Sequence, residues 1–254
     1  MAKCYRLVLA VVAAQLPLSV RSTAAPPAIL EEKDGWLQLF NGKDLTGWKL
    51  PEKLDSGGGL QSYEAKRNAD GKVTAYIAKS VSKKTKEESD VTIWQVEDGV
   101  IAGGGPMTHL FTDRDDFADV HIRCEFKISD KGNSGLFFRS GFRPGVPKGY
   151  EAQINATHSD RVKTGSIYPN AEFGLDKYPR EQTCIMDKAA HNPDEWVVYE
   201  VIAKGPQLTT IVNGKKQVEW TDPENRFKKG HIALQAHDPG SKMWFRKVEV
   251  KELK

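Results

Sequence analysis

Acidic, imidazole and amide side chains recur at every second position in short segments of this sequence. Glu151 and Gln153 are two residues apart, and Gln235 and His237 have the same spacing. Because side chains alternate across a strand, each pair would share one face of its strand. Arg139 ends another such segment and could meet Glu151 if the two strands are neighbours. Carboxylate and imidazole groups transfer protons, and amide and guanidinium groups offer the paired hydrogen bonds that suit sugars.

Apolar residues fill the alternate positions of the same segments, so each segment can be sorted into a core face and an outer face. Gly132 and Gly135 flank Asn133-Ser134, where a bulge or a close backbone approach is plausible. The expected core face holds Cys124, Leu136, Phe138, Ile154 and Leu234. The expected outer face, on one concave side, holds Glu125, Arg139, Glu151, Gln153, Gln235 and His237.

The outer faces favour a carbohydrate ligand, because aromatic rings there could stack on a sugar and amides could bind its hydroxyls. Phe137 and Tyr168 are the expected stacking surfaces, and Asn133 and Glu125 are further expected contacts. For any single strand the alternative interpretation is ordinary solvation of its polar face.

Several common hydrolytic motifs are absent from the sequence. There is no Glu-x-Asp-x-x-Glu string, which would hold the paired acids of a retaining glycosidase, and no Gly-x-Ser-x-Gly elbow. No tight His-x-His or His-x-x-x-His spacing occurs either. The sequence therefore predicts no cofactor and no metal site, although His and Glu residues leave a divalent cation open.

Short runs rich in Val, Ile, Phe and Tyr fill the chain after Ile93, and Asp-Gly, Asn-Gly and Pro-Gly pairs separate them. This punctuation is typical of an all-β protein. About a dozen short strands predict two packed sheets, a jelly-roll or concanavalin A-like, lectin-like β-sandwich. Cys124 is expected to be buried on a strand and Cys184 to be exposed in a loop, with no disulfide between them.

The first residues resemble a processing signal. Lys3 and Arg6 precede an apolar run over 7–20, and small residues follow, which predicts a signal peptide over 1–24 and a secreted or periplasmic protein. Residues 25–35 are expected to form a flexible lead-in, and 36–254 one β-sandwich domain with a surface insertion at about 51–90. Removing 1–24 removes three basic residues and no acid, so the mature charge is zero. We therefore expect no nucleic-acid partner and no membrane span.

Five ordered motifs resemble the 3-keto-disaccharide hydrolase domain family, which has a concanavalin A-like sandwich. They are residues 39–48 (LFNGKDLTGW), 94–101 (WQVEDGVI), 125–127 (EFK), 133–139 (NSGLFFR) and 150–154 (YEAQI). The resemblance covers nearly all of the mature chain. The main departure is the stretch 51–90, since members usually pass quickly from the first Trp motif to the second. This stretch could line or cover the groove.

The resemblance implies cleavage of 3-keto-glycosides. A ketone at C3 acidifies the C2 hydrogen, so a base can remove it and the C1 substituent can leave by β-elimination; hydration would complete a net hydrolysis. We expect Glu151 or His237 to be the base or acid, with Arg139 and Gln153 supporting the oxyanion. The competing hypothesis is a lectin-like binding module without turnover, and a purely structural or interaction module is a third.

Overall fold

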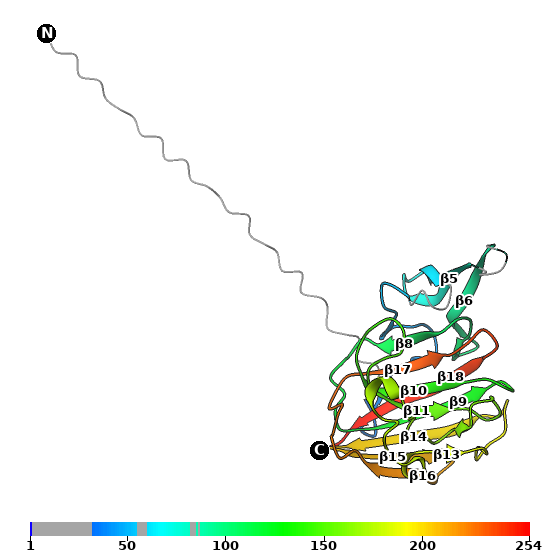
Figure 1. Ribbon diagram of the computed structural model, residues 1–254. Helices are drawn as coiled ribbons and strands as arrows, with labels where there is room; N and C mark the ends of the chain where they lie inside the picture. The colour runs from blue at the N-terminus through cyan, green and yellow to red at the C-terminus, as the bar shows by residue number, and fades with distance from the viewer. Residues whose placement is uncertain (2–31, 55–59, 82–84, 86) are drawn as a thin grey trace.

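The structure, a computed structural model, describes residues 1, 32–54, 60–81, 85 and 87–254. The expected signal peptide over 1–24 and most of the lead-in lie outside the described residues, apart from Met1. Almost all regular structure in the described part is antiparallel β. The prediction of an all-β, two-sheet sandwich is confirmed (Figure 1).

The larger sheet has eleven strands, and its central strands carry one buried face. In β9 the side chains alternate between buried and half-buried along the whole strand, as expected for a sheet that packs on one side only. The order along this sheet is β16 (Lys215–Thr221), β15 (Gln207–Val212), β14 (Val197–Lys204), β9 (Val120–Ile128), β18 (Met243–Glu252), β7 (Val100–Gly103), β6 (Glu88–Glu97), β5 (Val73–Val81) and β4 (Leu60–Arg67), and β1 (Glu32–Lys33) and β2 (Trp36–Gln38) join it beside β18.

The smaller sheet has five strands, and its centre is buried on both faces. All residues of β10, β11 and β17 are buried, although only one of their faces packs against the larger sheet. The other face must therefore be covered by loops, which makes it a place where polar groups can be enclosed. The order is β11 (Tyr150–Ile154), β10 (Ser134–Ser140), β17 (His231–Ala236), β8 (Thr108–Thr112) and β3 (Trp48–Lys49).

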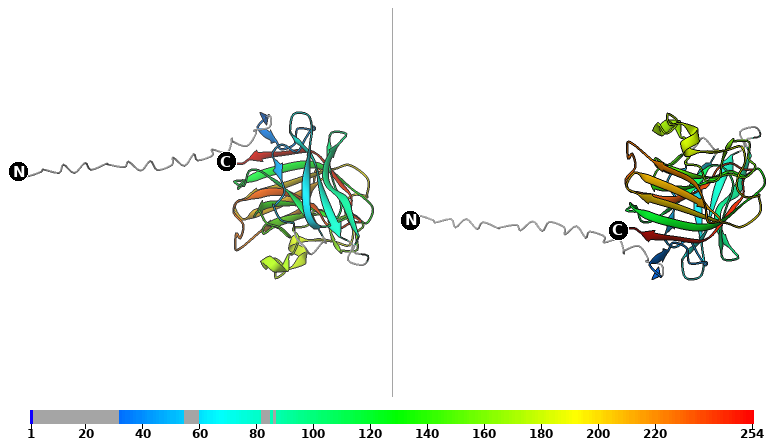
Figure 2. Two further views of the ribbon diagram at one scale, coloured as in Figure 1. Left: turned by 90° about the horizontal axis from the view of Figure 1, so that it is seen from above. Right: turned by 90° about the horizontal axis from the view of Figure 1, so that it is seen from below.

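The remaining elements are short. A two-stranded sheet pairs β12 (Val162–Lys163) with β13 (Ile185–Met186), and the helical turns are η2 (Ala171–Phe173) and α1 (Arg180–Thr183). The helical turns lie on the outside of the sandwich (Figure 2). None of the helices in the described part of the chain is long and apolar enough to cross a membrane.

The apolar faces of the two sheets meet in one core. Phe126 and Phe245 contribute from the larger sheet, and Phe138, Ile154 and Leu234 contribute from the smaller one. The expected core residues Cys124 and Leu136 are also fully buried there. Burial of each such side chain contributes roughly 1.5–3 kcal/mol to folding. Alternation therefore sorted these strands correctly into core and outer faces.

The stretch 51–90 is more regular than the sequence suggested. It was expected only as a surface insertion, but β4, β5 and the start of β6 form an edge of the larger sheet, and the β5–β6 hairpin extends beyond the rest of the sandwich (Figure 1). Tyr76 and Ala78 belong to the core. In β4 the half-buried Tyr63 and Ala65 alternate with exposed polar residues, and this two-residue period is hidden by the Lys and Glu content.

Candidate functional site

A row of functional side chains crosses the loop-covered face of the smaller sheet. Gln153 on β11 pairs with Gly135 on β10, and Glu151 pairs with Phe137 in the same register. On the other side of β10, Gln235 of β17 pairs with His109 of β8. Adjacent strands therefore bring an acid, two amides and an imidazole onto one face of the sheet.

Gly135 leaves the space that Glu151 occupies. A methyl group at Gly135 would overlap the Glu151 carboxyl, so only a glycine at this position lets the carboxyl lie across β10. Gly135 is one of the two glycines that flank Asn133-Ser134, where the sequence indicated a close approach, and the group that approaches it is the Glu151 carboxyl.

Glu151 is buried and its carboxyl has no hydrogen-bond partner among the described residues. Burial removes water from the carboxylate, and the negative charge of Asp160 lies close by. Both effects, burial first, raise the pKa of Glu151 from the ordinary 4.5 to about 8. A carboxyl held this way exchanges its proton near neutrality, which is a property of general acids and bases.

His109 is a buried neutral imidazole in the same row. Burial chiefly, and then the charge of His237, lowers the pKa of His109 to about 3, while a hydrogen bond with the backbone of Gly145 acts in the opposite direction. Its Nε2 atom is buried without a partner, as is Oε1 of Gln235. Buried polar atoms are almost always hydrogen-bonded, so these two atoms mark a place for a polar ligand.

The loop after β11 adds a second set of polar groups. The buried Asn155 side chain donates to the carbonyls of Asp160 and Val162 and accepts from the amide of His158, which closes the loop on itself. Buried Lys163 donates to the carbonyls of His158 and Asp160. These contacts fix His158 and Asp160 at the edge of the Glu151 row.

Tyr168 joins this loop to Glu151. Its hydroxyl donates to Oδ2 of Asp160 at 2.9 Å, and its backbone amide donates to the carbonyl of Glu151 at 2.8 Å. Burial, followed by the hydrogen bond to Asp160, raises the pKa of Tyr168. The expected ligand contact Tyr168 therefore lies beside Glu151, half-buried, with its hydroxyl engaged.

His237 lies two residues beyond Gln235, and its Nδ1 atom is 2.9 Å from Oδ2 of Asp238. Asp238 in turn accepts from Ser241, whose Oγ accepts the backbone amide of Asn133. The Oδ1 atom of Asn133 is buried and unpartnered. These hydrogen bonds join the start of β10 to the turn after β17. Asn133, Gln235 and His237, all expected as site residues, therefore lie close together.

The rings of His158 and His237 approach edge to face, with centroids 5.7 Å apart. One ligating atom from each of His158, His237 and Asp238 lies within 4.8 Å of the others. Among the described residues this is the group of His, Cys, Asp and Glu side chains that could hold a metal ion. The spacing of residues in the sequence could not predict this group, because its three residues come from two loops.

Arg139 does not join the site, contrary to the expectation. The register between β10 and β17 shifts between Phe137 and Ser140, and Arg139 has a positive φ of 49°. This bulge turns the side chain away from Glu151. Its guanidinium donates to the carbonyls of Ala118 and Gly205, each at 2.7 Å, and pairs with Asp119 at 3.0 Å. Arg139 therefore ties the two sheets together.

Two further expectations need correction. Glu125 lies on β9 of the other sheet and pairs with Arg246 and Lys247, because alternation tells which face of a strand a residue takes but not which sheet the strand joins. Phe137 lies on the expected face, but it is buried with Phe111 against Val146 and cannot serve as an open stacking surface.

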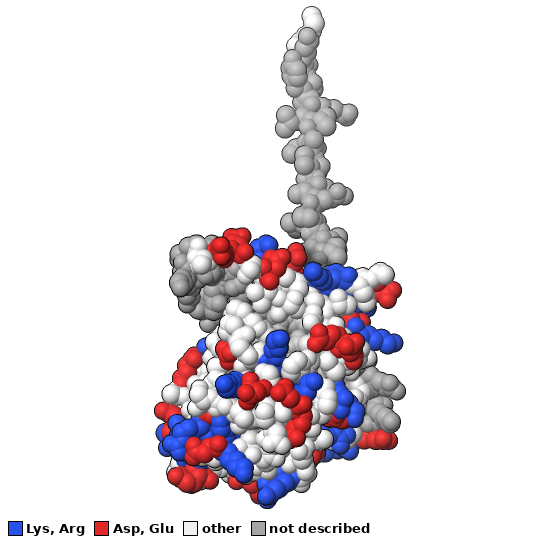
Figure 3. Space-filling view, turned by 90° about the vertical axis from the view of Figure 1, so that its right-hand side faces the viewer, with Lys and Arg blue, Asp and Glu red and all other residues white. Residues whose placement is uncertain are grey.

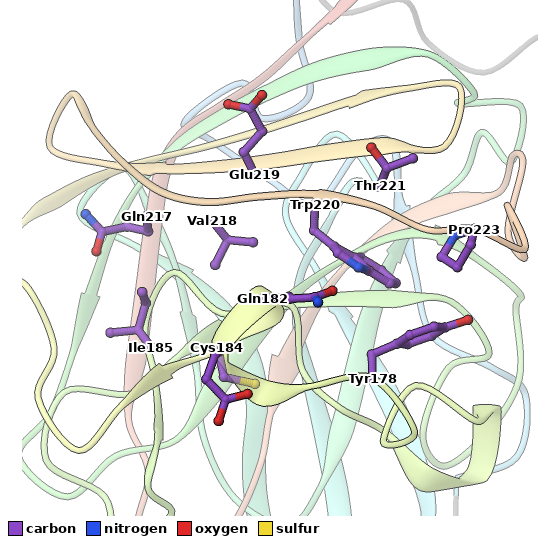
Figure 4. A pocket seen from close by; sticks show the side chains of 11 residues that line it. Tyr178, Gln182, Cys184, Ile185, Gln217, Val218, Glu219, Trp220, Thr221 and Pro223 are labelled. Carbon is purple, nitrogen blue, oxygen red and sulfur yellow. The ribbon is translucent and has the colours of Figure 1, made fainter.

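The two cysteines of the described part of the chain, Cys124 and Cys184, are both free and both buried. Burial raises the pKa of Cys124 to about 12 and also raises that of Cys184. The expectation that Cys184 is exposed was wrong, since its loop packs under β16 and the thiol lies against Ile167 and Thr183. It lines a separate hollow of about 580 Å³ beside α1, with Tyr178 and Trp220 opposite (Figure 4).

This hollow lacks the features that mark a reactive site. The hydroxyl of Tyr178 is already bonded to Arg226, and Glu181 and Glu219 are exposed. The surface charges do not indicate another binding site on the face in Figure 3, because acidic and basic side chains are interspersed over it. We therefore place the candidate site at Glu151.

The structure is thus a β-sandwich with a row of buried polar and titratable side chains on its smaller sheet. Residues 35–251 match the 3-keto-alpha-glucoside-1,2-lyase-like domain, and the chain belongs to this family. The resemblance seen in the sequence motifs is thereby confirmed. Family membership supports a carbohydrate-related role.

Two solved structures show the same fold. One is a putative glycosyl hydrolase from Parabacteroides distasonis, with 24% identity over 87% of this chain and 94% of that chain, and a TM-score of 0.59. The other comes from work on endo-acting O-glycanases of prominent human gut bacteria that initiate mucin breakdown, with 13% identity over 83% and 94% of the two chains and a TM-score of 0.50. A search of curated proteins found no match.

Proposed function

We propose that this protein is an exported enzyme that cleaves 3-keto-glycosides, 3-keto-disaccharides included, with Glu151 as the base that takes the proton from C2. One observation carries the proposal: the Glu151 carboxyl is buried, lacks a hydrogen-bond partner among the described residues, and has a pKa of about 8. The name of the family, a 1,2-lyase-like domain, agrees with proton removal at C2 and bond cleavage at C1.

The elimination requires removal of the C2 proton, cleavage of the bond between C1 and its substituent, and a proton for the leaving group. The Glu151 carboxylate takes the C2 proton, and the electron pair of the C2–H bond forms the enolate of the C3 ketone. Collapse of the enolate then makes the C1–C2 double bond and expels the C1 substituent, which leaves with a proton. Water addition across the double bond gives net hydrolysis.

The raised pKa of Glu151 suits both proton removal from C2 and proton donation to the leaving group. A base of higher pKa takes a carbon-bound proton more readily, as Brønsted behaviour requires. Once protonated, Glu151 is a stable neutral acid in this enclosed place, so the same group can return its proton to the leaving oxygen. His237, nearby and half-buried, is the second candidate for that acid.

The unpartnered buried atoms fit a hydroxyl-bearing ligand. With Nδ1 of His109 used for the backbone of Gly145, its Nε2 atom is an acceptor, as is Oε1 of Gln235. Both could accept from sugar hydroxyls. A lectin-like module would gain nothing from an enclosed, uncompensated carboxyl such as Glu151, because burying it without a partner costs stability.

The test is incubation of the mature protein with 3-keto-trehalose and with α- and β-linked 3-keto-glucosides, followed by mass spectrometry in heavy-oxygen water. Elimination followed by hydration predicts an unsaturated 3-keto intermediate, slower turnover when C2 carries deuterium, and solvent oxygen at C1. Binding without turnover across this panel would support the lectin-like alternative instead.

The proposal that the protein is exported rests on the charged and apolar pattern of residues 3–20. Expression of the full chain in a bacterial host, followed by fractionation and N-terminal sequencing, tests it. A mature N-terminus near Ala25 in the periplasm or medium is the expected result. Retention of the intact chain in the cytoplasm would contradict it.

A further inference from the structure

We propose that His158, His237 and Asp238 form a binding site for one divalent first-row transition metal at the edge of the Glu151 row. The site deepens the proposed function and, in its catalytic consequence, rests on it. The donor atoms come from the loop after β11 and the turn after β17, which the fold brings side by side.

The geometry is close to that of a bound ion. One ligating atom of each residue lies within 4.8 Å of the other two. Two imidazole nitrogens on a tetrahedral ion would be roughly 3.3 Å apart, given metal–nitrogen distances of about 2.0–2.1 Å. Small rotations of two side chains, both half-buried at the surface, are enough to close this difference.

The second nitrogen of each ring already has a hydrogen-bond partner. Nδ1 of His158 accepts the backbone amide of Asp160 at 3.1 Å, so the neutral ring carries its proton on Nε2, and binding an ion through Nε2 requires the other tautomer, in which this hydrogen bond is given up. Nδ1 of His237 is held by Asp238 at 2.9 Å, which leaves Nε2 of His237 free. A histidine oriented through its second nitrogen by a carboxylate is the usual arrangement at metal centres.

Asp238 can serve this site in two ways. Its carboxylate already accepts from Ser241 and from the amide of Gly240, so it is held rigidly. It can orient His237 or turn one oxygen to the ion. In the first case two imidazoles hold the ion, and in the second two imidazoles and a carboxylate hold it; both donor sets suit Mn²⁺, Fe²⁺, Co²⁺ or Zn²⁺ better than Ca²⁺ or Mg²⁺.

An independent observation also indicates a ligand here. Gln235 is two residues before His237 and 3% exposed, yet its Oε1 atom has no partner. His109, opposite Gln235 on β8, also has a buried unpartnered nitrogen. A ligand bound to the ion would lie over these atoms and could satisfy them.

The ion would supply what the side chains lack. Elimination from a 3-keto-glycoside needs an electrophile at the enolate oxygen, and Arg139, expected in that role, is held by Asp119 and backbone carbonyls. Lys163 is likewise engaged by three oxygens. A divalent cation beside Glu151 would stabilise the developing oxyanion.

The experiment measures binding without substrate. The mature protein is stripped with a chelator, and Mn²⁺ is titrated while free Mn²⁺ is followed by electron paramagnetic resonance, with Zn²⁺ titration calorimetry in parallel. The variants are His158→Ala and His237→Ala, and the control is His121→Ala, whose ring pairs with Glu200 on the opposite sheet. Thermal melts of each stripped variant report folding.

We expect one ion per chain, weakened 10- to 100-fold or more by each site substitution and unchanged by His121→Ala. If a site variant fails to fold, His158→Gln, which keeps a hydrogen-bonding side chain, replaces it. No stoichiometric binding, or equal binding by all folded variants, would overturn the site. Binding without turnover supports the site and contradicts the proposed enzyme, whereas full turnover by stripped, metal-free protein supports the enzyme and contradicts a catalytic role for the ion.

Discussion

Replacing Glu151 by Gln should make the protein more stable at alkaline pH. Gln keeps the shape of the side chain but cannot ionise, so it removes the free energy needed to place a charge in this buried position. The wild-type carboxyl has a pKa of about 8 when folded against an ordinary 4.5. Below the ordinary value it is neutral in both folded and unfolded chains, and the substitution has little effect through this group.

The sign follows from proton binding. Between these two pH values the folded chain holds a proton on Glu151 that the unfolded chain has lost, so wild-type stability falls as the pH rises toward about 8. Each pH unit in this window corresponds to about 1.4 kcal/mol, and the whole window to about 5 kcal/mol. Above pH 8 the difference stays constant.

The assay is urea unfolding followed by tryptophan fluorescence at pH 5 to 9, with chelator present. The free energy of unfolding of Glu151→Gln, relative to that of the wild type, should increase steadily with pH and reach its full value near pH 9. Glu125→Gln is the control of opposite sign: burial would raise the pKa of Glu125, but Lys247 and Arg246 lower it, so this variant should lose stability above the ordinary pKa. Parallel curves for wild type and Glu151→Gln across this range would refute the buried, uncompensated carboxyl.

Three further predictions separate catalysis from structure. Gly135→Ala should push the Glu151 carboxyl aside and lower turnover of a 3-keto-glycoside by at least about 10-fold. The control Gly141→Ala, whose new methyl would lie 3.8 Å from the nearest atom, should leave turnover unchanged. Equal rates for the two variants would contradict the packing of Glu151 against Gly135. Arg139→Met should lower the free energy of unfolding by about 3 kcal/mol, because Asp119 and the part-buried carbonyls of Ala118 and Gly205 lose their partner, yet it should leave turnover per folded molecule intact. A rate loss without a stability loss would return Arg139 to the site. Glu125→Gln should leave turnover unchanged, and a large loss would show that the larger sheet takes part.

The strands and their faces could be predicted because alternation is a local property. The expected core residues of β10 and β17 are buried in the core, and Glu151, Gln153, Gln235 and His237 share the outer side of the smaller sheet. Alternation failed at Arg139 because a bulge adds a residue to the strand, and nothing in the local sequence shows where the partner strand slips.

The missed residues are those that long-range packing brings in. His109 had a local signal, since it directly precedes the apolar pair Leu110 and Phe111, but its burial depends on the loop that carries Val146. His158 and Asp160 follow a predicted strand in a polar loop, and only the folded chain places them beside His237. Sequence spacing could not reveal a metal-binding group assembled this way.

The measurement that tests the central claim most directly is the rate of aglycone release from a 3-keto-glycoside by the wild type and by Glu151→Gln. Both proteins are assayed between pH 6 and 9 with substrate binding measured separately. The account predicts a wild-type rate that rises toward about pH 8, where the base ionises, and a loss of about 10²–10⁴-fold in the variant with binding retained. An unchanged rate in Glu151→Gln would remove Glu151 from the mechanism and contradict the account.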